Sequence, residues 1–261
     1  LFGDRSIEAD FEIMSLMISS LHSLGLDDIH VELGDVSVYR TLIEQAALDA
    51  SVSDEIFGLI QKKARHALVQ LTKARVNDPA LADRINALPE LCGSASVLDD
   101  AERLFAGDIV ALSAVERLRA LIERLASRFP SLTLSIDLSE LRGFSYHTGV
   151  GFAAYHNGSG RLMARGGRYD NVGELFGRAR PATGFDIELS SLLDQLKGIE
   201  TKPLVDVGTV EQPTKAIEAA LWEKIAALRS EGYRVIEGES LGKEALKRLQ
   251  FDGSKWVLED R

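Results

Sequence analysis

Residues 142–186 concentrate the side chains of this chain that could bind a small ligand. Three glycine-marked blocks, RGFSYHTG at 142–149, RGGRYD at 165–170 and TGFD at 183–186, are joined by strand-like segments, and six arginines but no lysine lie between residues 142 and 196. A guanidinium can hold a carboxylate or phosphate in two places, and glycine lets the backbone approach a ligand or turn with positive φ. The blocks therefore predict a pocket for a small zwitterion or anion. The alternative is that the glycines only form hairpin turns and the arginines only solvate a sheet.

The sequence lacks the residue patterns typical of metal sites, nucleotide-binding loops and serine hydrolases. The histidines are scattered, and none pairs with another histidine or a cysteine at metal-ligand spacing; they are His22, His30, His66, His147 and His156. The sequence contains neither a P-loop nor a Gly-x-Ser-x-Gly elbow, and the glycine pattern at 149–151 is too short for a Rossmann site. No metal and no cofactor are therefore expected. Cys92, the single cysteine, is interpreted as a buried small apolar residue rather than a nucleophile.

The composition is that of an ordinary folded protein with an acidic balance. The chain has 261 residues, of which 45% are hydrophobic, a net charge of −10 and a pI near 5.1. Because nucleic-acid binding requires clustered Lys and Arg, this charge argues against tRNA as a partner. No run of about 18 apolar residues is present, so no membrane helix is expected, and the cysteine usage suits a cytoplasmic location. The chain begins at Leu1 without a methionine, which predicts that an N-terminal part precedes it.

Hydrophobic periodicity predicts the elements that would position the glycine-marked blocks. Helices are expected over 7–25, 38–50, much of 51–128, and 189–196, and strands over 29–33, 132–138, 150–155 and 183–187. The strand at 150–155 is interpreted as a partner or neighbour of the strand at 132–138, with a hairpin turn at 157–160 and another turn at 165–167. After a linker at 197–203, a small α/β unit is predicted over 204–261, with strands at 204–207 and 232–236, helices at 214–230 and 240–249, and a closing hairpin at 251–257.

The same blocks resemble those of histidyl-tRNA synthetases. RGFSYHTG at 142–149 is similar to the histidine-specific loop of that family, RGLDYY followed by TG, and GGRYD at 166–170 is similar to another of its blocks. ADFE at 9–12 resembles the segment just after class II motif 2. The resemblance covers about residues 1–40 and 132–196. It implies a class II aminoacyl-tRNA synthetase-like α+β fold: a core over residues 1–196 with a mostly antiparallel sheet, flanking helices and a helical insertion at about 41–130.

Departures from the synthetase pattern indicate a non-catalytic relative. Motif 3 of the synthetases runs roughly GFAIGMERL, whereas residues 184–192 read GFDIELSSL. The glycine that admits ATP corresponds to Glu188, and the arginine that binds its γ-phosphate corresponds to Ser191. A carboxylate repels phosphate and serine offers no guanidinium fork, so adenylate formation should be lost. The run FGRARPATGF at 176–185 is similar to the regulatory subunits of ATP phosphoribosyltransferase, which are paralogues of the synthetases.

This second resemblance implies a function without chemistry of its own. Members of that family assemble, as a homodimer within a hetero-oligomer, with the short-form catalytic subunit of ATP phosphoribosyltransferase. They are required for its full activity and for feedback inhibition by histidine in the first step of histidine biosynthesis. The implied histidine site consists of Arg142, Tyr146, His147, Gly166, Gly167 and Tyr169, with a further part expected upstream of Leu1. The alternatives are a catalytic-core fragment of a histidyl-tRNA synthetase and an assembly scaffold with a vestigial pocket.

Overall fold

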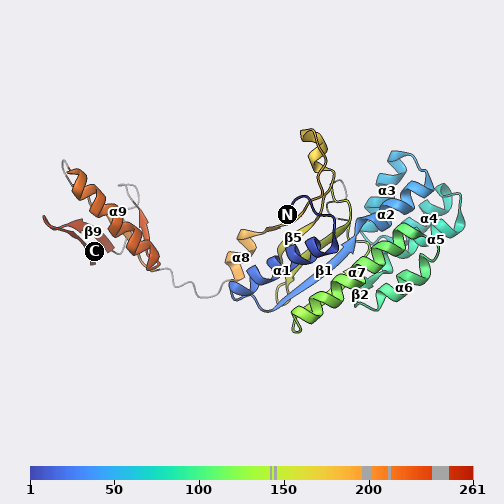
Figure 1. The fold of residues 1–261 in the computed structure, drawn as a ribbon, viewed down its shortest axis with the longest axis horizontal. Helices are drawn as coiled ribbons and strands as arrows, with labels where there is room; N and C mark the ends of the chain where they lie inside the picture. The colour runs from blue at the N-terminus through green and yellow to red at the C-terminus, as the bar shows by residue number, and fades with distance from the viewer. Residues whose placement is uncertain (142, 144–145, 196–201, 211–212, 237–246, 261) are drawn as a thin grey trace. The chain divides into compact units, whose positions relative to one another are not determined.

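The computed structural model describes residues 1–141, 143, 146–195, 202–210, 213–236 and 247–260 (Figure 1). The chain divides into two compact units, Leu1–Leu196 and Lys197–Arg261. Each unit has a hydrophobic core of its own, and the core of the first unit is much the larger. In the part of the chain that the structure describes, no helix is both long enough and apolar enough to cross a membrane.

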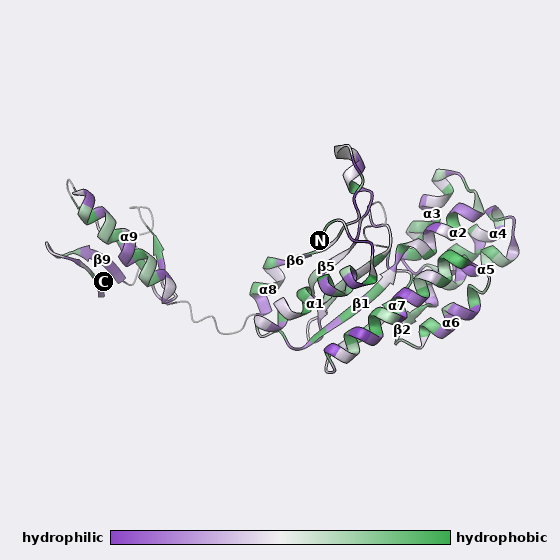
Figure 2. Cartoon of the chain, in the orientation of Figure 1, coloured by the Kyte–Doolittle hydropathy of each residue, from purple (hydrophilic) through white to green (hydrophobic). Residues whose placement is uncertain are grey.

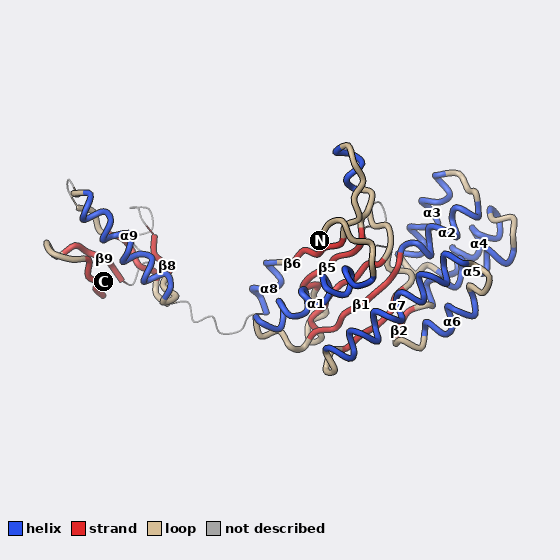
Figure 3. The backbone as a smooth tube through the Cα atoms, viewed as in Figure 1, coloured by secondary structure: helices blue, strands red, loops and turns tan. Residues whose placement is uncertain are grey.

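The larger unit is built on a mixed sheet. Among its described residues, six strands follow the order β2-β3-β1-β4-β5-β6 (Figure 3). They are β1 (Ile29–Asp35), β2 (Cys92–Gly93), β3 (Thr133–Asp137), β4 (Val150–His156), β5 (Leu162–Arg168) and β6 (Thr183–Ile187). β1 runs parallel to β3 and antiparallel to β4, and the other neighbouring pairs are antiparallel. The predicted adjacency of 150–155 and 132–138 was therefore wrong, because β1, with Val31 and Leu33 fully buried, lies between them.

Two helices pack against the sheet and create the core. α1 (Ile7–Ser23) contacts β4, β5 and β6, and α7 (Ile109–Arg128) contacts β1 and α1 (Figure 3). The apolar residues of α1 recur at three- and four-residue spacing, which buries Met14, Met17 and Leu21 completely. The helix ends at Ser23, two residues before the predicted limit at 25, and Gly25, with a φ of 79°, donates its N–H to the His22 carbonyl at 2.9 Å. α8 (Leu189–Gln195) follows β6.

Helices between β1 and α7 form the insertion, and their residues mix hydrophilic and hydrophobic character (Figure 2). They are α2 (Val36–Ala46), α3 (Ala50–Gln61), α4 (Arg65–Arg75), α5 (Pro79–Ala87) and α6 (Val97–Leu104), with a 3-10 turn at Leu88–Glu90. β1 extends two residues beyond the predicted limit at 33, through Gly34 and Asp35, and the Asp35 carboxylate caps α2 by accepting from the Ser37 N–H at 2.9 Å. α2 ends at Ala46 rather than at residue 50, because Ala47 adopts a left-handed conformation with φ 48°.

The short strand β2 interrupts the helical insertion. Cys92 pairs with Asp137 at the edge of the sheet, and its side chain is exposed. The interpretation of this cysteine as a buried residue was therefore wrong. Two residues of edge strand in an otherwise helical stretch carry no alternating pattern, so periodicity could not identify them.

The smaller unit is an α/β layer pair. Its described strands follow the order β10-β9-β7-β8, and helix α9 (Lys215–Ser230) contacts β8 and β10. The strands are β7 (Leu204–Val207), β8 (Arg234–Ile236), β9 (Lys247–Phe251) and β10 (Trp256–Asp260). The predicted hairpin is confirmed by a turn in which the Asp252 N–H donates to the Lys255 carbonyl at 3.0 Å and Gly253 has a φ of 98°. The helix expected at 240–249 was wrong at residues 247–249, which belong to β9, and its remainder lies outside the described residues.

Candidate functional site

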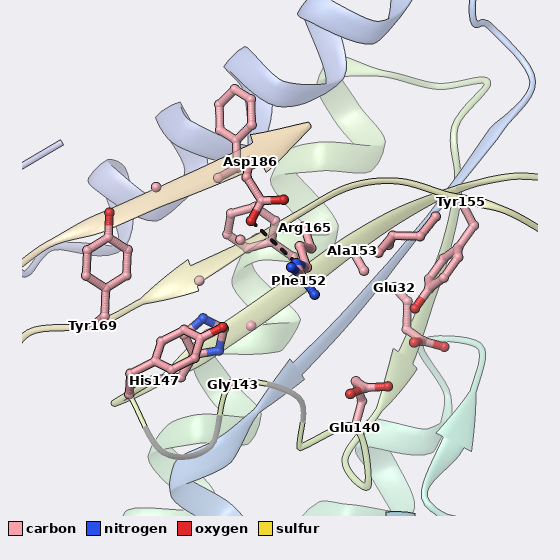
Figure 4. A pocket seen from close by; sticks show the side chains of 17 residues that line it. Glu32, Glu140, Gly143, His147, Phe152, Ala153, Tyr155, Arg165, Tyr169 and Asp186 are labelled. Carbon is pink, nitrogen blue, oxygen red and sulfur yellow. Dashed lines mark hydrogen bonds and ion pairs between the residues drawn. The ribbon is translucent and has the colours of Figure 1, made fainter. Parts of the chain in front are cut away.

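A pocket of about 360 Å³ opens on the sheet face opposite α1 and α7 (Figure 4). Strands β1, β4, β5 and β6 form its floor, and a wall is contributed by Gly143, Tyr146 and His147. The lining includes five residues of the predicted site: Tyr146, His147, Gly166, Gly167 and Tyr169. Arg142 lies outside the described residues. The fold thus brings the described members of the predicted site together, while the identity of their ligand stays a prediction.

A row of glycines crosses the pocket floor. The row consists of glycines paired across neighbouring strands, Gly34, Gly151, Gly167 and Gly184, of which the last three line the pocket. A Cβ on Gly167 would lie 2.8 Å from the His147 ring, and one on Gly184 would lie 2.6 Å from the Tyr169 hydroxyl oxygen. The absence of these Cβ atoms lets two polar rings rest directly on the sheet. The predicted turn at 165–167 was wrong, because these residues lie inside β5, where glycine permits close approach rather than chain reversal.

The His147 ring is held from several sides. Gly143, with φ 80°, lies so close that a Cβ there would be 2.7 Å from the ring. The Tyr146 ring meets the His147 ring edge-on, with centroids 4.7 Å apart and an interplanar angle of 76°. Arg40 on α2 donates from Nη2 to the His147 carbonyl oxygen at 2.9 Å. Arg40 therefore positions the backbone of the pocket wall, a role that no local sequence pattern indicated.

Backbone hydrogen bonds attach the end of this wall to the sheet. The Thr148 N–H donates to the Arg168 carbonyl at 2.8 Å, and the Asp170 N–H donates to the Thr148 hydroxyl at 3.0 Å. The Val36 N–H donates to the Gly149 carbonyl at 3.1 Å. The TG end of the first block and the RYD end of the second are thus one hydrogen-bonded unit, although 18 residues or more separate them in sequence. This unit ties the pocket wall to the start of α2.

Arg168 lies beneath the floor and does not face the pocket. Its Nη2 lies 2.9 Å from Asp10 Oδ1, and its Nε lies 3.1 Å from both Asp10 oxygens. The two side chains are 7% and 1% exposed, and Nη1 also donates to the Asp4 carbonyl at 2.9 Å. Burial raises the pKa of the Asp10 carboxyl, while the hydrogen bonds and charge of Arg168 oppose that rise. The expectation that the arginines of this region bind a ligand is therefore wrong for Arg168, which joins β5 to α1.

Charged residues lie on a second row of the pocket face. Glu32, Ala153, Arg165 and Asp186 are paired in that order across β1, β4, β5 and β6. Arg165 Nε lies 3.4 Å from Asp186 Oδ2, and Arg165 Nη2 lies 3.9 Å from Glu188 Oε1. Glu140, in the loop after β3, lines the pocket near Glu32 (Figure 4).

Three acidic residues that were not predicted from the sequence also line the pocket: Glu32, Glu140 and Asp186. The alternation of β1 was an available signal, because it places His30 and Glu32 on the face opposite Val31 and Leu33. His30 lies near the pocket in the same row as Tyr155, and its Nε2 lies 2.6 Å from the Ser135 hydroxyl. Burial lowers the pKa of His30, which favours the neutral ring.

A second cavity, of about 330 Å³, adjoins the first and shares Glu32, Glu140 and Tyr155 with it. The end of α3 lines this cavity. Gln61 donates from Nε2 to the Ser139 carbonyl at 2.8 Å, and Lys63, with φ 49°, lies with its Nζ 2.9 Å from Asp137 Oδ2. The helical insertion therefore holds the segment that leads from β3 into the pocket wall. Among the side chains that the structure describes, no group of three or more His, Cys, Asp and Glu could hold a metal ion.

The mixed sheet, the helices on one face and the glycine-floored pocket on the other define a class II aminoacyl-tRNA synthetase-like core. The model of the histidyl-tRNA synthetase family matches residues 1–192, and the chain belongs to that family. A regulatory subunit of ATP phosphoribosyltransferase from Pseudomonas fluorescens is 43% identical over 238 residues, which cover 91% of this chain and 59% of that protein. The chain spans about three fifths of the length of the curated relatives it matches.

Solved structures support the fold. A Bacillus halodurans protein described as an ATP phosphoribosyltransferase regulatory subunit/histidyl-tRNA synthetase has a TM-score of 0.68 and 24% identity, with 93% of this chain and 62% of that chain covered. A chain of the ATP phosphoribosyl transferase HisG:HisZ complex from Thermotoga maritima has a TM-score of 0.56 and 22% identity, with 71% and 62% covered. At these identities the likeness carries the fold alone.

Proposed function

We propose that this chain is part of a non-catalytic regulatory subunit of ATP phosphoribosyltransferase, acting in the first step of histidine biosynthesis. The observation that carries the proposal is the 43% identity to such a subunit over 91% of the chain. Glu188 adds to it, because this residue replaces the glycine that admits ATP in the synthetases, and its Oε1 lies 3.9 Å from Arg165 Nη2. The partners are a catalytic subunit, as in the Thermotoga maritima complex, and a second copy of this chain, within a cytoplasmic hetero-oligomer.

Histidine is the proposed effector of this assembly. The pocket of about 360 Å³ is large enough for a single amino acid, and it offers polar rings from His147, Tyr146 and Tyr169 for an imidazole. Arg142, which the synthetase resemblance assigns to the same site, is included in the proposal. An effector regulates only when its affinity differs between two states of the assembly. The contacts of Lys63 with Asp137 at the end of β3, and of Gln61 with Ser139 in the loop that follows, support a route from the pocket to the helical insertion.

The proposal is tested by reconstitution. The full-length protein should form a complex with the short-form catalytic subunit, raise its phosphoribosyltransferase rate and make that rate sensitive to histidine. Sedimentation of each protein alone and of the mixture measures assembly, and the rate with and without histidine measures regulation. A protein that forms no complex at micromolar concentration and leaves the rate unaltered would refute the assignment.

The full-length protein should not form histidyl-adenylate. Glu188 places a carboxylate, and Ser191 a neutral hydroxyl, at positions where a synthetase admits and clamps ATP. Pyrophosphate exchange that depends on histidine and ATP should therefore equal the background without enzyme. A true histidyl-tRNA synthetase, assayed in parallel, provides the positive control. Exchange above background would favour the alternative that the chain is a fragment of a synthetase core.

A further inference from the structure

We infer that the segment between β5 and β6, residues 171–182, is a docking arm for the catalytic subunit, and that its Arg178 and Arg180 bind carboxylates on an acidic surface of that partner. The inference rests on the proposed function in naming the partner. It concerns a surface outside the pocket, because neither arginine lines the pocket. The observations that carry it are the pairing of the arginines in this region, the fixed backbone of the arm and the exposure of its side chains.

The two arginines of the arm differ from the arginines that precede them in sequence. Those in and next to β5 all pair with carboxylates of this chain: Arg161 with Asp194, Arg165 with Asp186, and Arg168 with Asp10. Arg178 and Arg180 are exposed, and no ion pair or side-chain hydrogen bond joins either of them to another residue that the structure describes. Each guanidinium offers five N–H donors. These donors are therefore available to a group outside the described part of the chain.

Backbone hydrogen bonds fix the shape of the arm. At its base, the Tyr169 N–H donates to the Ala182 carbonyl at 2.8 Å, and the Ala182 N–H donates to the Asp170 carboxylate at 3.1 Å. Further out, the Arg178 N–H donates to the Gly173 carbonyl at 3.1 Å, and a Cβ on Gly173 would lie 2.4 Å from the Arg178 carbonyl oxygen. The two limbs of the arm are thus in contact with each other. A preorganised arm loses less conformational entropy when it binds a partner.

The arm projects beyond the end of the sheet, where another protein can reach it; it is the gold segment in Figure 1. Its 3-10 turn, Val172–Phe176, leaves Val172 36% exposed. Arg178 and Arg180 are both exposed, while Ala179 between them is half-buried. The arm therefore presents arginine and apolar side chains together, a combination that is typical of protein interfaces.

Acidic groups near the arm do not neutralise the two arginines. Asp170 is 17% exposed, and its Oδ1 lies 3.2 Å from Arg168 Nη1. Glu174 is exposed and forms no ion pair with any described side chain. A planar guanidinium can bind a carboxylate through two parallel hydrogen bonds, and arginine is enriched among the residues that dominate interface affinity. The complementary chemistry is therefore an acidic protein surface.

The catalytic subunit is the partner that the sequence of the arm favours. Both arginines belong to the run FGRARPATGF at 176–185, in which the chain resembles the regulatory subunits. Synthetases and regulatory subunits share the class II-like core, whereas assembly with a catalytic subunit is proposed for the regulatory subunits alone. A second copy of this chain, with 40 acidic and 30 basic residues, is the alternative occupant, and the experiment below distinguishes the two.

Sedimentation velocity of the full-length protein with the short-form catalytic subunit, over a range of concentrations, tests the assignment. Arg178→Gln and Arg180→Gln should each raise the dissociation constant about ten- to a hundredfold, which corresponds to the loss of a charge-assisted hydrogen bond. Glu174→Gln, on the same arm, is the matched control. It should leave the dissociation constant unchanged or lower it, because it removes a charge that an acidic surface repels. Added salt should weaken assembly of the wild-type protein more than assembly of the arginine variants.

Each variant should melt at the wild-type temperature, since the substituted side chains are exposed. Assembly of both arginine variants with wild-type affinity would overturn the docking assignment and leave the proposed function intact, whereas a wild-type protein that forms no complex would refute both. If the arginine variants bind the catalytic subunit normally but lose self-association, the arm binds a second copy and the assigned partner is wrong. Weakening by Glu174→Gln as large as that by the arginine substitutions would show that the partner surface is not acidic.

Discussion

Replacing Arg168 with alanine is expected to lower the free energy of unfolding by about 3–5 kcal/mol, the range observed when one partner of a buried ion pair is removed. The reason is that Asp10, 1% exposed, would keep its carboxylate without the guanidinium now 2.9 Å away. Two carbonyls, of Asp4 and Ser6, would lose their donors as well. Urea unfolding followed by circular dichroism measures the difference.

The matched control is Arg161→Ala, seven residues earlier and next to the same strand β5. Arg161 pairs with Asp194 in solvent, where ion pairs contribute at most about 1 kcal/mol. With Arg168 removed, burial alone raises the pKa of Asp10, so the folded variant binds a proton that the unfolded chain releases. The deficit of Arg168→Ala should therefore be larger at neutral than at mildly acidic pH. Equal effects of the two substitutions would contradict the assignment of Arg168 as a buried structural residue.

Replacing Gly166 with alanine is expected to cost about 1–3 kcal/mol or more, as overpacking of a closed interior does. The added Cβ would lie 2.3 Å from the Gly184 carbonyl oxygen and 2.6 Å from the Phe152 ring. Because the first clash involves backbone, it is relieved only by moving β6 away from β5. The Arg165 and Asp186 side chains would move with these strands, so histidine affinity of the full-length protein should fall together with stability. Unfolding curves and calorimetry measure the two effects.

Gly58→Ala provides the contrasting control. Gly58 lies within α3, and a Cβ there meets no atom within 4 Å. Since glycine in a helix interior is less favourable than alanine by about 0.5–1 kcal/mol, this substitution should raise stability by a similar amount. Loss of stability in both glycine variants would show that the cost at Gly166 does not arise from the close approach of β6.

Element types along this chain follow from local patterns. The apolar residues of α1 recur at three- and four-residue spacing, and Gly25 follows the helix. The residues of β3 alternate in polarity. Both patterns lie within short segments and specify a helix or a strand whatever element packs against them. The Asp-Gly turn between β9 and β10 is of the same kind, because only the turn residues themselves must adopt the required φ. For the same reason the glycine-marked blocks identified the pocket region and its family before any contact was known.

Strand order and the limits of short elements depended on long-range contacts. β1 lies between β3 and β4 because its two alternating faces fit a central position, one against the core and one under the pocket. The sequence of β4, residues 150–156, does not determine whether β1 or β3 pairs with it, because both strands offer similar backbone hydrogen-bonding groups at their edges. The exposed strand at Cys92 likewise exists only because Asp137 is present beside it.

Residue types alone determined that the stretch 142–186 carries arginines and glycines suited to binding an anionic or zwitterionic ligand. Only the tertiary structure decided which arginine serves which purpose. Arg165 and Arg168 are three residues apart on one strand, so they project from opposite faces. One face of β5 packs on α1, where Arg168 and Asp10 form a buried ion pair. The other face forms the floor of the pocket, where the Arg165 side chain stays accessible. The helix that covers one face determines which face is buried. Its Asp10 is 158 residues from Arg168 in sequence, so no local pattern contains that contact.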